Sequence, residues 1–590
     1  MKKQKKSYLK YLLRAVSIQF KSTPVHMIIM MLIISLEAIG LTARTIVNEN
    51  LFDAIIGASL GKISFFQCLF PIVIMAVVTL GQQAMNGIKF WYWPVIVDKT
   101  AGINNKLLFK KLQNVEAINF ENTEFLDDLN KAKQGIEPLS SVALNVVNVL
   151  CFDGIYALSL GWYLFSVCPV LIITLFLAFI PALVSQMVRM KYYEKLESES
   201  APIRRENEYY YKAVCDKEFF KETRVLGAFR YFSKCFSESL EILAKKQWKT
   251  EKKTTLIDMS LNSVTFLGMG LSVLVLFMET MRGTVPIAVF AAVFTSLKTI
   301  FDVMDAMMRW DITGISNDIG KVTNYIDIMD YKESGGVKGT KSDTKSVVAD
   351  SVVFRYPLAD KDAIQNVSLC IQNGETLAIV GENGSGKSTL IKLLTGIYKP
   401  DSGNVIVDGL NTKEYDMASV RKGISGVLQN FQKYKMSLLD NIILSDPYVS
   451  DGLGDRVNCT ITDIGFDLKV NYDTLLSPEF GGLDLSGGEW QRIAIARGIY
   501  RMHDFIVLDE PTAAIDPIEE DRVFNQFKEI VKGKNAIVVT HRLGSVRLVD
   551  KIIVMDNGKI VDMGTHEELI AKEGKYAELW KAQAKWYERE

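Results

Sequence analysis

The chain has 590 residues, which is enough for several domains, and 48% of them are hydrophobic. Its mean hydropathy is +0.13, which is high for a soluble protein and favours a part embedded in a membrane. The 68 basic and 68 acidic residues give a formal net charge of zero, so the charge gives no reason to expect nucleic acid as a partner. The seven cysteines have no CxxC spacing, which argues against a zinc site or a disulfide framework and leaves free thiols as our expectation.

Six apolar stretches of roughly membrane-spanning length fill the first half of the chain. A helix of about 20 apolar residues crosses a bilayer, so we predict six transmembrane helices. The third and fourth stretches, and the fifth and sixth, are joined by short turns and form two hairpins. The first stretch is too long for a signal peptide and is followed by further spans, so it should stay in the membrane. The stretches lie near residues 25–47, 64–88, 141–165, 168–188, 258–278 and 285–306.

The positive charges predict the orientation of these spans. Six Lys or Arg residues lie among the first fourteen residues, seven lie in the loop 89–138 and sixteen in the loop 189–257, whereas the other three loops hold only Lys62 and Arg282. Basic loops tend to stay in the cytoplasm, although less strictly when they are long. We therefore place the N-terminus and both long loops in the cytoplasm of a plasma-membrane protein. Helical spacing of charged and aromatic residues in the second long loop predicts that the spans continue as helices beyond the bilayer.

A few polar residues interrupt the apolar stretches. A charged side chain in the bilayer core is costly and usually faces a bundle interior or a water-filled path. We take Glu37, Arg44 and Lys298 as candidate residues of a substrate cavity. The alternative is that such residues pair or lie near the interface, as Lys298 and Asp302 could, being four residues apart. The stretches also contain Gln82, Gln83, Asn145, Asn148 and Asp153.

The composition changes after residues 333–346, a linker poor in apolar residues. From there short strands alternate with helices, as is typical of a soluble α/β domain. Within it "ETLAIV" predicts a buried strand, "GENGSGKST" (381–389) a glycine-rich loop and "LIKLLTG" a helix. Strand, loop and helix in this order are the context that the phosphate-binding pattern GxxxxGK[ST] requires.

Each residue type in this loop has a chemical reason. Gly381, Gly384 and Gly386 allow backbone N–H groups and the helix N-terminus to approach phosphate oxygens closely. Lys387 can reach the β- and γ-phosphates, and the Ser388 hydroxyl can ligate Mg²⁺. The loop therefore predicts a site for a nucleoside triphosphate.

Two later segments supply candidate catalytic groups. "FIVLDE" predicts a strand that ends in two carboxylates, of which Asp509 would hold Mg²⁺ through water and Glu510 would polarise an attacking water. "NAIVVTHR" places His541 at the end of another apolar strand. From its spacing alone, His541 has either a structural role or a contact with the γ-phosphate.

Together these motifs resemble the ATP-binding cassette (ABC) family, in the half-transporter arrangement of six spans followed by one cassette. "GENGSGKST" is similar to its Walker A motif, "FIVLDE" to its Walker B motif, "LSGGE" to its signature, "AAID" to its D-loop and "THR" to its switch histidine. The resemblance implies an all-α six-helix transmembrane domain followed by an α/β P-loop NTPase domain. The expected parts are a basic N-terminal segment 1–23, a transmembrane domain 24–332, a linker 333–346 and a cassette 347–590.

The resemblance also implies roles for individual residues. Glu510 and His541 would be catalytic, and Tyr356 would stack on adenine. The residues implied to bind ATP are Tyr356, Gly381, Glu382, Asn383, Gly384, Ser385, Gly386, Lys387, Ser388, Thr389 and Gln429. Those implied to hold Mg²⁺ are Ser388, Gln429 and, through water, Asp509. Those implied to face the ATP of a partner chain are Ser486, Gly487, Gly488 and Glu489 of the signature and Asp516 of the D-loop.

In this family the signature of one cassette closes over the ATP bound by another, and this chain has one cassette. We therefore expect a homodimer, with a heterodimer as the alternative, surrounded by membrane lipid. The order of spans resembles the exporter type, whose coupling helices we expect near residues 118–129 and 213–222. No peptidase domain precedes the spans, so we expect no cleavage of a leader peptide.

Two departures from the family pattern bear on the substrate. Glu489 stands where the signature usually has Gln. The preceding stretch "SPEFGGLDLSGG" lacks the TxVGExG pattern of multidrug and lipid exporters and, with "EWQR" and "INFENTEF", is more similar to exporters of lantibiotics and other small modified peptides. We therefore expect ATP-driven export of a small peptide by alternating access. A lipid or multidrug exporter and a non-transporting ATP-driven sensor or immunity protein are the alternatives.

Overall fold

The chain folds into two units, one made of Met1–Leu112 and Asp127–Tyr331 and the other of Gln113–Leu126 and Lys332–Glu590. The structure is a computed structural model, and the residues that it describes are 8–342, 345–448, 452–465, 470–511, 528–540, 546 and 549–587.

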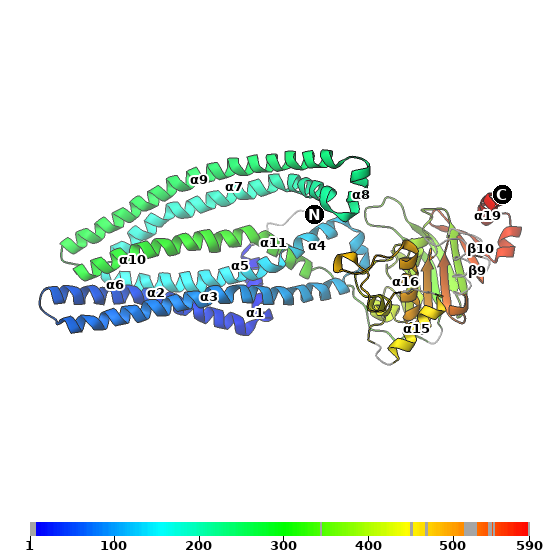
Figure 1. The fold of residues 1–590 in the computed structure, drawn as a ribbon, viewed down its shortest axis with the longest axis horizontal. Coiled ribbons are helices and arrows are strands. Elements are labelled where there is room, and N and C mark those ends of the chain that lie inside the picture. The colour runs from blue at the N-terminus through cyan, green and yellow to red at the C-terminus, as the bar shows by residue number, and fades with distance from the viewer. Residues whose placement is uncertain are drawn as a thin grey trace. The chain divides into compact units, whose positions relative to one another are not determined.

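Helices build the first unit (Figure 1). They contain six segments that are long and apolar enough to cross a membrane, which confirms the six predicted spans. Two short π-helical segments, η2 (Val149–Asp153) and η3 (Met307–Ile312), join α5 to α6 and α10 to α11. The helices are α1 (Tyr8–Ser22), α2 (Pro24–Ser59), α3 (Phe65–Asn114), α4 (Thr123–Lys133), α5 (Ile136–Asn148), α6 (Gly154–Val167), α7 (Pro169–Cys215), α8 (Lys217–Val225), α9 (Phe229–Met281), α10 (Ile287–Ala306) and α11 (Thr313–Met329).

Helices α7 and α9 are much longer than a bilayer is thick. With 53 residues, α9 extends about 80 Å at 1.5 Å per residue, whereas the hydrocarbon core measures about 30 Å. The prediction that the spans continue as helices beyond the bilayer is therefore confirmed. The two helices lie side by side (Figure 1), and Ser185 of α7 donates a hydrogen bond to Asp258 of α9 at 2.7 Å.

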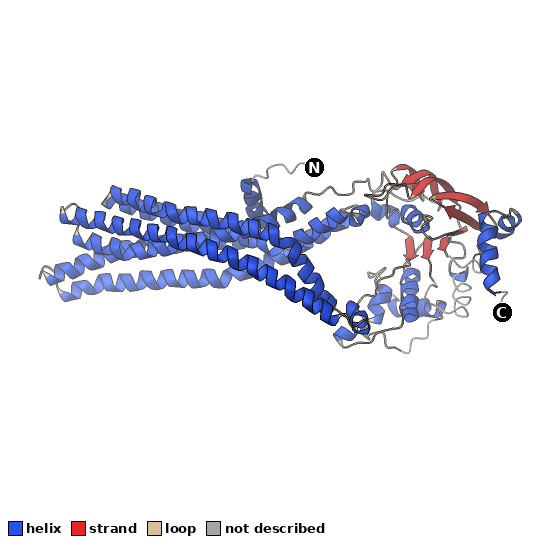
Figure 2. Ribbon diagram, turned by 90° about the horizontal axis from the view of Figure 1, so that it is seen from above, coloured by secondary structure: helices blue, strands red, loops and turns tan. Residues whose placement is uncertain are grey.

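The second unit contains two sheets, drawn as red strands in Figure 2. One is antiparallel, in the order β2-β1-β4-β5. The other has the order β10-β9-β3-β8-β7-β6 and is parallel except for the β9–β10 pair. The strands are β1 (Val347–Phe354), β2 (Ile364–Ile371), β3 (Thr376–Gly381), β4 (Ser402–Val407), β5 (Leu410–Asn411), β6 (Ile424–Val427), β7 (Phe505–Asp509), β8 (Asn535–Val539), β9 (Lys551–Asp556) and β10 (Lys559–Gly564).

Helices cover the parallel sheet because its central strands are buried and mostly apolar. Every residue of β7 and β8 is buried, as expected of parallel strands packed on both faces. A core that includes Phe505 and Ile537 packs against α12, and a second core that includes Ile506 packs around Trp490 of α16. The predicted α/β domain is confirmed. The helices of this unit are α12 (Lys387–Leu394), α13 (Met417–Arg421), α14 (Leu438–Ile443), α15 (Leu453–Asp463), α16 (Gly487–Tyr500), α18 (His566–Ala571) and α19 (Lys575–Tyr587).

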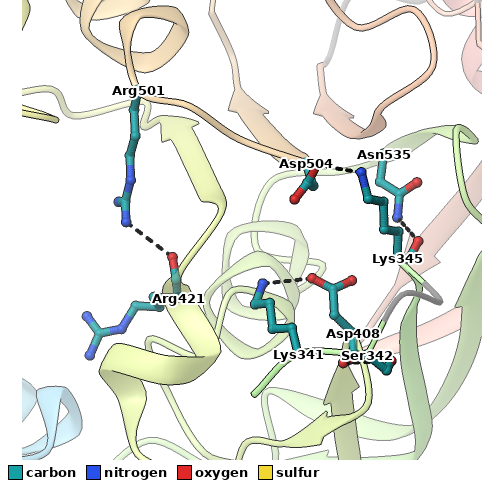
Figure 3. Close-up of polar contacts among 8 residues, drawn as sticks. All are labelled: Lys341, Ser342, Lys345, Asp408, Arg421, Arg501, Asp504 and Asn535. Carbon is teal, nitrogen blue, oxygen red and sulfur yellow. Dashed lines mark hydrogen bonds and ion pairs between the residues drawn. The ribbon is translucent and has the colours of Figure 1, made fainter. Parts of the chain in front are cut away.

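The end of the predicted linker is held against the second unit by polar contacts (Figure 3). The Lys341 ammonium lies 2.7 Å from the buried Asp408 carboxylate. The Lys345 ammonium lies 2.8 Å from the Asp504 carboxylate. The backbone carbonyl oxygen of Lys345 accepts a hydrogen bond of 2.6 Å from the Asn535 side chain. The end of the linker is therefore part of the second unit.

The contact between α7 and α9 requires a small residue at position 268. A Cβ atom on Gly268 would lie 2.7 Å from the Ala178 Cβ and 2.9 Å from its Cα, whereas a Cβ on Gly270 would meet nothing within 4 Å. Overpacking of this kind costs about 1–3 kcal/mol, and both substitutions to alanine gain the same helix propensity. We expect Gly268→Ala to unfold at a lower temperature than Gly270→Ala in a thermal melt of the purified protein. Equal melting temperatures would contradict the close approach.

Candidate nucleotide site

The loop between β3 and α12 has a backbone that only glycine adopts readily. Gly381 has a φ of +152° and Gly386 a φ of +104°. A Cβ atom would lie 2.2 Å from the Met555 carbonyl oxygen at the first position and 2.8 Å from the Ala363 carbonyl oxygen at the second. Glycine at both positions therefore lets the loop pass close to neighbouring backbone and present its amides at the start of α12.

Lys387 begins α12 and folds back over this loop. Its ammonium donates hydrogen bonds to the carbonyl oxygens of Gly381 at 2.8 Å and Glu382 at 2.9 Å. Burial lowers the pKa of Lys387, and the nearby carboxylates of Glu510 and Asp509 oppose that shift. The loop therefore holds a buried ammonium beside a helix N-terminus, and both favour an anion.

Two carboxyl groups stand at the end of β7, close to the loop. Asp509 is buried, and burial is the largest cause of its raised pKa, followed by the charge of Glu510. The Ser388 side chain forms a hydrogen bond with Asp509. Glu510 has a φ of +49°, an uncommon conformation for a residue with a side chain, and accepts a hydrogen bond of 2.7 Å from the Gln429 amide. The prediction that these groups surround one site therefore agrees with the geometry of the described residues.

The oxygens at this site fit a magnesium ion bound together with phosphate. Oδ1 of Asp509 is buried and has no hydrogen-bond partner within the part of the chain that is described. The Ser388 hydroxyl forms its hydrogen bond with the same carboxyl group. Among the described residues, no group of three or more His, Cys, Asp or Glu side chains is placed to hold a metal. Mg²⁺ typically combines one or two protein oxygens with phosphate and water, so this sparse donor set suits it.

Tyr356 lies just past the end of β1 and reaches α12. Its hydroxyl oxygen is 3.1 Å from the Thr389 hydroxyl oxygen, and its ring packs edge-on against Phe354 and Tyr398. The Lys392 ammonium lies 5.8 Å from the ring centre. The predicted aromatic residue is therefore held against the helix that carries the phosphate loop.

The signature segment caps helix α16. The Ser486 hydroxyl accepts a hydrogen bond from the Glu489 N–H at 3.3 Å, while the Ser486 N–H and hydroxyl donate to the Glu489 carboxylate at 2.7 and 2.8 Å. This capping box satisfies donors that a helix N-terminus leaves unpaired. Trp490 is buried and anchors the first turn. The acidic residue that replaces the usual glutamine is thus bonded to Ser486.

The structure places the other predicted residues as follows. Glu382 forms an ion pair of 2.8 Å with Lys575. Asn383 and Gly384 are exposed, Ser385 is buried, and Gly487 and Gly488 begin α16. Glu37 is buried and pairs with Lys89 at 2.7 Å, Arg44 donates to the Thr299 hydroxyl at 3.1 Å, and Lys298 is exposed. Asp516 and His541 lie outside the described residues.

Gln491 is a site residue that the sequence analysis missed. Its amide donates hydrogen bonds to the Pro511 and Glu510 carbonyl oxygens. It therefore braces the backbone that carries the Glu510 carboxylate. The only sequence signal was its place in "EWQR", directly after the signature, because nothing in the local pattern predicts a contact with Pro511.

Residues 113–126 fold as part of the second unit, although they lie between the helical segments of the first. Ala117 and Ile118 pack against the core of the second unit. The Tyr398 hydroxyl donates a hydrogen bond to Glu121, and burial together with this bond raises the pKa of Tyr398. The Lys399 ammonium donates to a Glu116 carboxylate oxygen at 3.0 Å. The first predicted coupling segment, 118–129, begins in this docked stretch.

Comparisons with known proteins agree with this geometry. The family described as "ABC transporter" matches residues 364–513. Over 481 residues the chain is 29% identical to the subtilin transport ATP-binding protein SpaT of Bacillus subtilis, covering 79% of this chain and 77% of that protein. It is 26% identical over 498 residues to the nisin transport ATP-binding protein NisT of Lactococcus lactis subsp. lactis, covering 81% of each.

Two further comparisons cover the cassette and the fold. The chain is 35% identical over 262 residues to an ATP-dependent lipid A-core flippase of Aliivibrio fischeri, covering 43% of this chain and 44% of that protein. It superposes on the structure of a bacterial Atm1-family ABC exporter with ATP bound, with a TM-score of 0.81 and 20% identity over 95% of this chain and 98% of that one. The latter likeness supports the fold.

Removal of the loop ammonium should weaken nucleotide binding. A hydrogen bond to a charged group contributes about 1.5–3 kcal/mol, so we expect Lys387→Ala to bind ATP about 10- to 100-fold more weakly. The measurement is equilibrium binding of a fluorescent ATP analogue to the purified protein. Lys361→Ala, at an exposed position of the same unit, serves as the control and should bind like the unmodified chain. Unchanged affinity of Lys387→Ala would contradict the phosphate-binding role.

Loss of the Tyr398 hydroxyl should loosen the docked segment. Tyr398→Phe keeps the ring but removes the hydrogen bond to Glu121, so amide hydrogens of residues 113–126 should exchange faster. Hydrogen exchange followed by mass spectrometry measures this, with Tyr415→Phe as the control for loss of a tyrosine hydroxyl elsewhere in the unit. Identical exchange in both variants would show that the hydrogen bond does not hold the segment.

Proposed function

We propose that this chain, a member of the ABC transporter family with the fold of an ABC exporter, moves a small peptide, modified or unmodified, out of the cell. The observation that carries this proposal is the extent of similarity. The subtilin and nisin transport proteins align with 79% and 81% of this chain, and therefore with much of its helical unit. The lipid A-core flippases align with 40% to 52% of this chain, and this smaller extent favours a peptide over a lipid as cargo.

The phosphate loop binds ATP in this proposal. The backbone amides of residues 381–389 and the Lys387 ammonium hold the phosphates, because both are placed at the start of α12. Tyr356 stacks on the adenine, as its position against Thr389 supports. The ATP-binding unit lies on the cytoplasmic side of the plasma membrane, because the basic loops are predicted to lie there.

The carboxyl groups after β7 perform hydrolysis. Ser388, Gln429 and, through water, Asp509 would hold a Mg²⁺ ion, which would offset the phosphate charge. Glu510 accepts a proton from the attacking water, and its position is supported by the hydrogen bond from Gln429. We assign His541 to the γ-phosphate from its place after a buried strand.

A second copy of the chain completes each ATP site. Ser486, Gly487, Gly488 and Glu489, together with Asp516, face the ATP held by the partner cassette. The start of α16 at Gly487, directly after Ser486, supports this assignment because the positive end of the helix dipole lies at these residues. Binding of two ATP molecules closes the cassettes and turns the membrane cavity outward, and hydrolysis resets it.

The test combines a variant with a transport assay. We expect Glu510→Gln to bind ATP normally and to lose nearly all hydrolysis, because the amide accepts no proton from water. Glu567 is exposed, and Glu567→Gln serves as the control, which should hydrolyse ATP at the normal rate. In inverted vesicles that contain the full chain, ATP should drive uptake of labelled subtilin, and Glu510→Gln should abolish it.

Each other outcome of this assay identifies a different function. Uptake of a labelled lipid in place of subtilin would favour the lipid exporter. Hydrolysis without uptake of any solute would favour the sensor or immunity protein. Hydrolysis that survives in Glu510→Gln would refute the role given to that residue.

A further inference from the structure

Four charged side chains are grouped inside the helical unit, within segments long and apolar enough to cross a membrane. Glu37 of α2, Asp153 of η2 and Asp311 of η3 are 3%, 8% and 7% exposed. The Lys89 ammonium of α3 lies 2.7 Å from the Glu37 carboxylate and also interacts electrostatically with Asp153 and Asp311. Three carboxyl groups therefore share one ammonium.

The hydrogen bonds in this group leave acceptor oxygens without donors. The Asn148 amide nitrogen donates to Asp311 at 3.0 Å. Oδ2 of Asp153 and Oδ1 of Asn148 are buried and have no hydrogen-bond partner among the residues that the structure describes. A buried polar or charged group without a partner costs several kcal/mol. The group therefore lacks both positive charge and hydrogen-bond donors.

The backbone is irregular at both aspartates. Asp153 is the last residue of the π-helical segment η2, and Asp311 lies within the π-helical segment η3. These two segments contact each other. A π-helical turn inside an α-helix is rare and occurs frequently at functional sites. The contact between two π-helical segments that each carry an aspartate is a backbone observation, and it supports a functional site independently of the side-chain charges.

The depth of the group suits access from the cytoplasm. Glu37 and Asp153 lie near the middle of the apolar stretches 25–47 and 141–165, whereas Lys89 follows the stretch 64–88 and Asp311 follows the stretch 285–306. Both of these stretches end on the predicted cytoplasmic side. Lys89 and Asp311 thus lie at the ends of their stretches that face the side from which an exporter takes up its cargo.

An organic cation supplies what this group lacks. An ammonium or guanidinium group brings positive charge together with several N–H donors. A metal ion fits less well, because no three His, Cys, Asp or Glu side chains in the described residues are placed to hold one. In membranes, buried ionisable residues usually mark a substrate or ion path.

We propose that Asp153, Asp311 and Asn148 bind an ammonium or guanidinium group of the cargo, beside the ion pair of Glu37 and Lys89. Of the three residues expected from the sequence to line a substrate cavity, Glu37 belongs to this group. The inference rests on the proposed export function and narrows its substrate to peptides with a cationic group.

The experiment compares cargo with and without positive charge. Binding of subtilin, with its amino groups free or acetylated, is measured on the full chain in lipid nanodiscs. The free form should bind at least about 10-fold more tightly, since charged hydrogen bonds contribute about 1.5–3 kcal/mol. Asp153→Asn and Asp311→Asn should each lose this preference. Asp302→Asn removes an exposed carboxylate from α10 and should keep the preference.

The outcomes separate this inference from the proposed function. Equal binding of both forms of subtilin to the unmodified chain would overturn the cation site and leave peptide export standing. A preference that persists in both Asp153→Asn and Asp311→Asn would also overturn it. If neither form of subtilin binds, the proposed cargo is wrong. Binding of phenethylammonium is then compared with binding of its uncharged N-acetyl form to test the cation site. A preference for the cation that Asp153→Asn abolishes supports the site, and equal binding of the two compounds refutes it.

Discussion

Strands β3 and β7 run parallel on either side of β8, so their carboxyl ends emerge at the same edge of the sheet. The phosphate loop follows the first of these strands, and Asp509 and Glu510 follow the second. The nucleotide site depends on this pairing, because it brings an ammonium and two carboxyl groups from distant parts of the chain together at a helix N-terminus. Burial there lowers the pKa of Lys387 and raises that of Asp509. The charges of Lys387 and Asp509 oppose these shifts, because each favours the ionised form of the other.

The same helix that carries the phosphate loop also receives the segment 113–126. Lys392, on α12, lies 3.5 Å from Glu121, and Tyr398 and Lys399 follow shortly after the helix. This segment is covalently continuous with α3 and α4.

Buried charge is treated differently in the two units. In the nucleotide unit, Lys387, Asp509 and Glu510 are charges that complement one another around a place for phosphate. In the helical unit, Glu37 forms an ion pair with Lys89. Asp153 and Asp311 have no ammonium of their own among the described residues, and only Asp311 accepts a hydrogen bond from the Asn148 amide. An excess of acceptors inside an apolar layer is costly. Such an arrangement is expected where function, and not stability, selects the residues.

The sequence by itself determined the six spans, the α/β domain and the phosphate loop, because each follows from local pattern: apolar length, buried strands and the spacing of glycines before Lys387. The bond between Ser486 and Glu489 was also local, since these residues are three apart and match a capping box. The tertiary structure alone decided the brace from Gln491 to Pro511, the docking of Glu121 on Tyr398 and the meeting of Asp153 with Asp311. These contacts join residues up to 277 positions apart, and no single-sequence periodicity carries information over that distance.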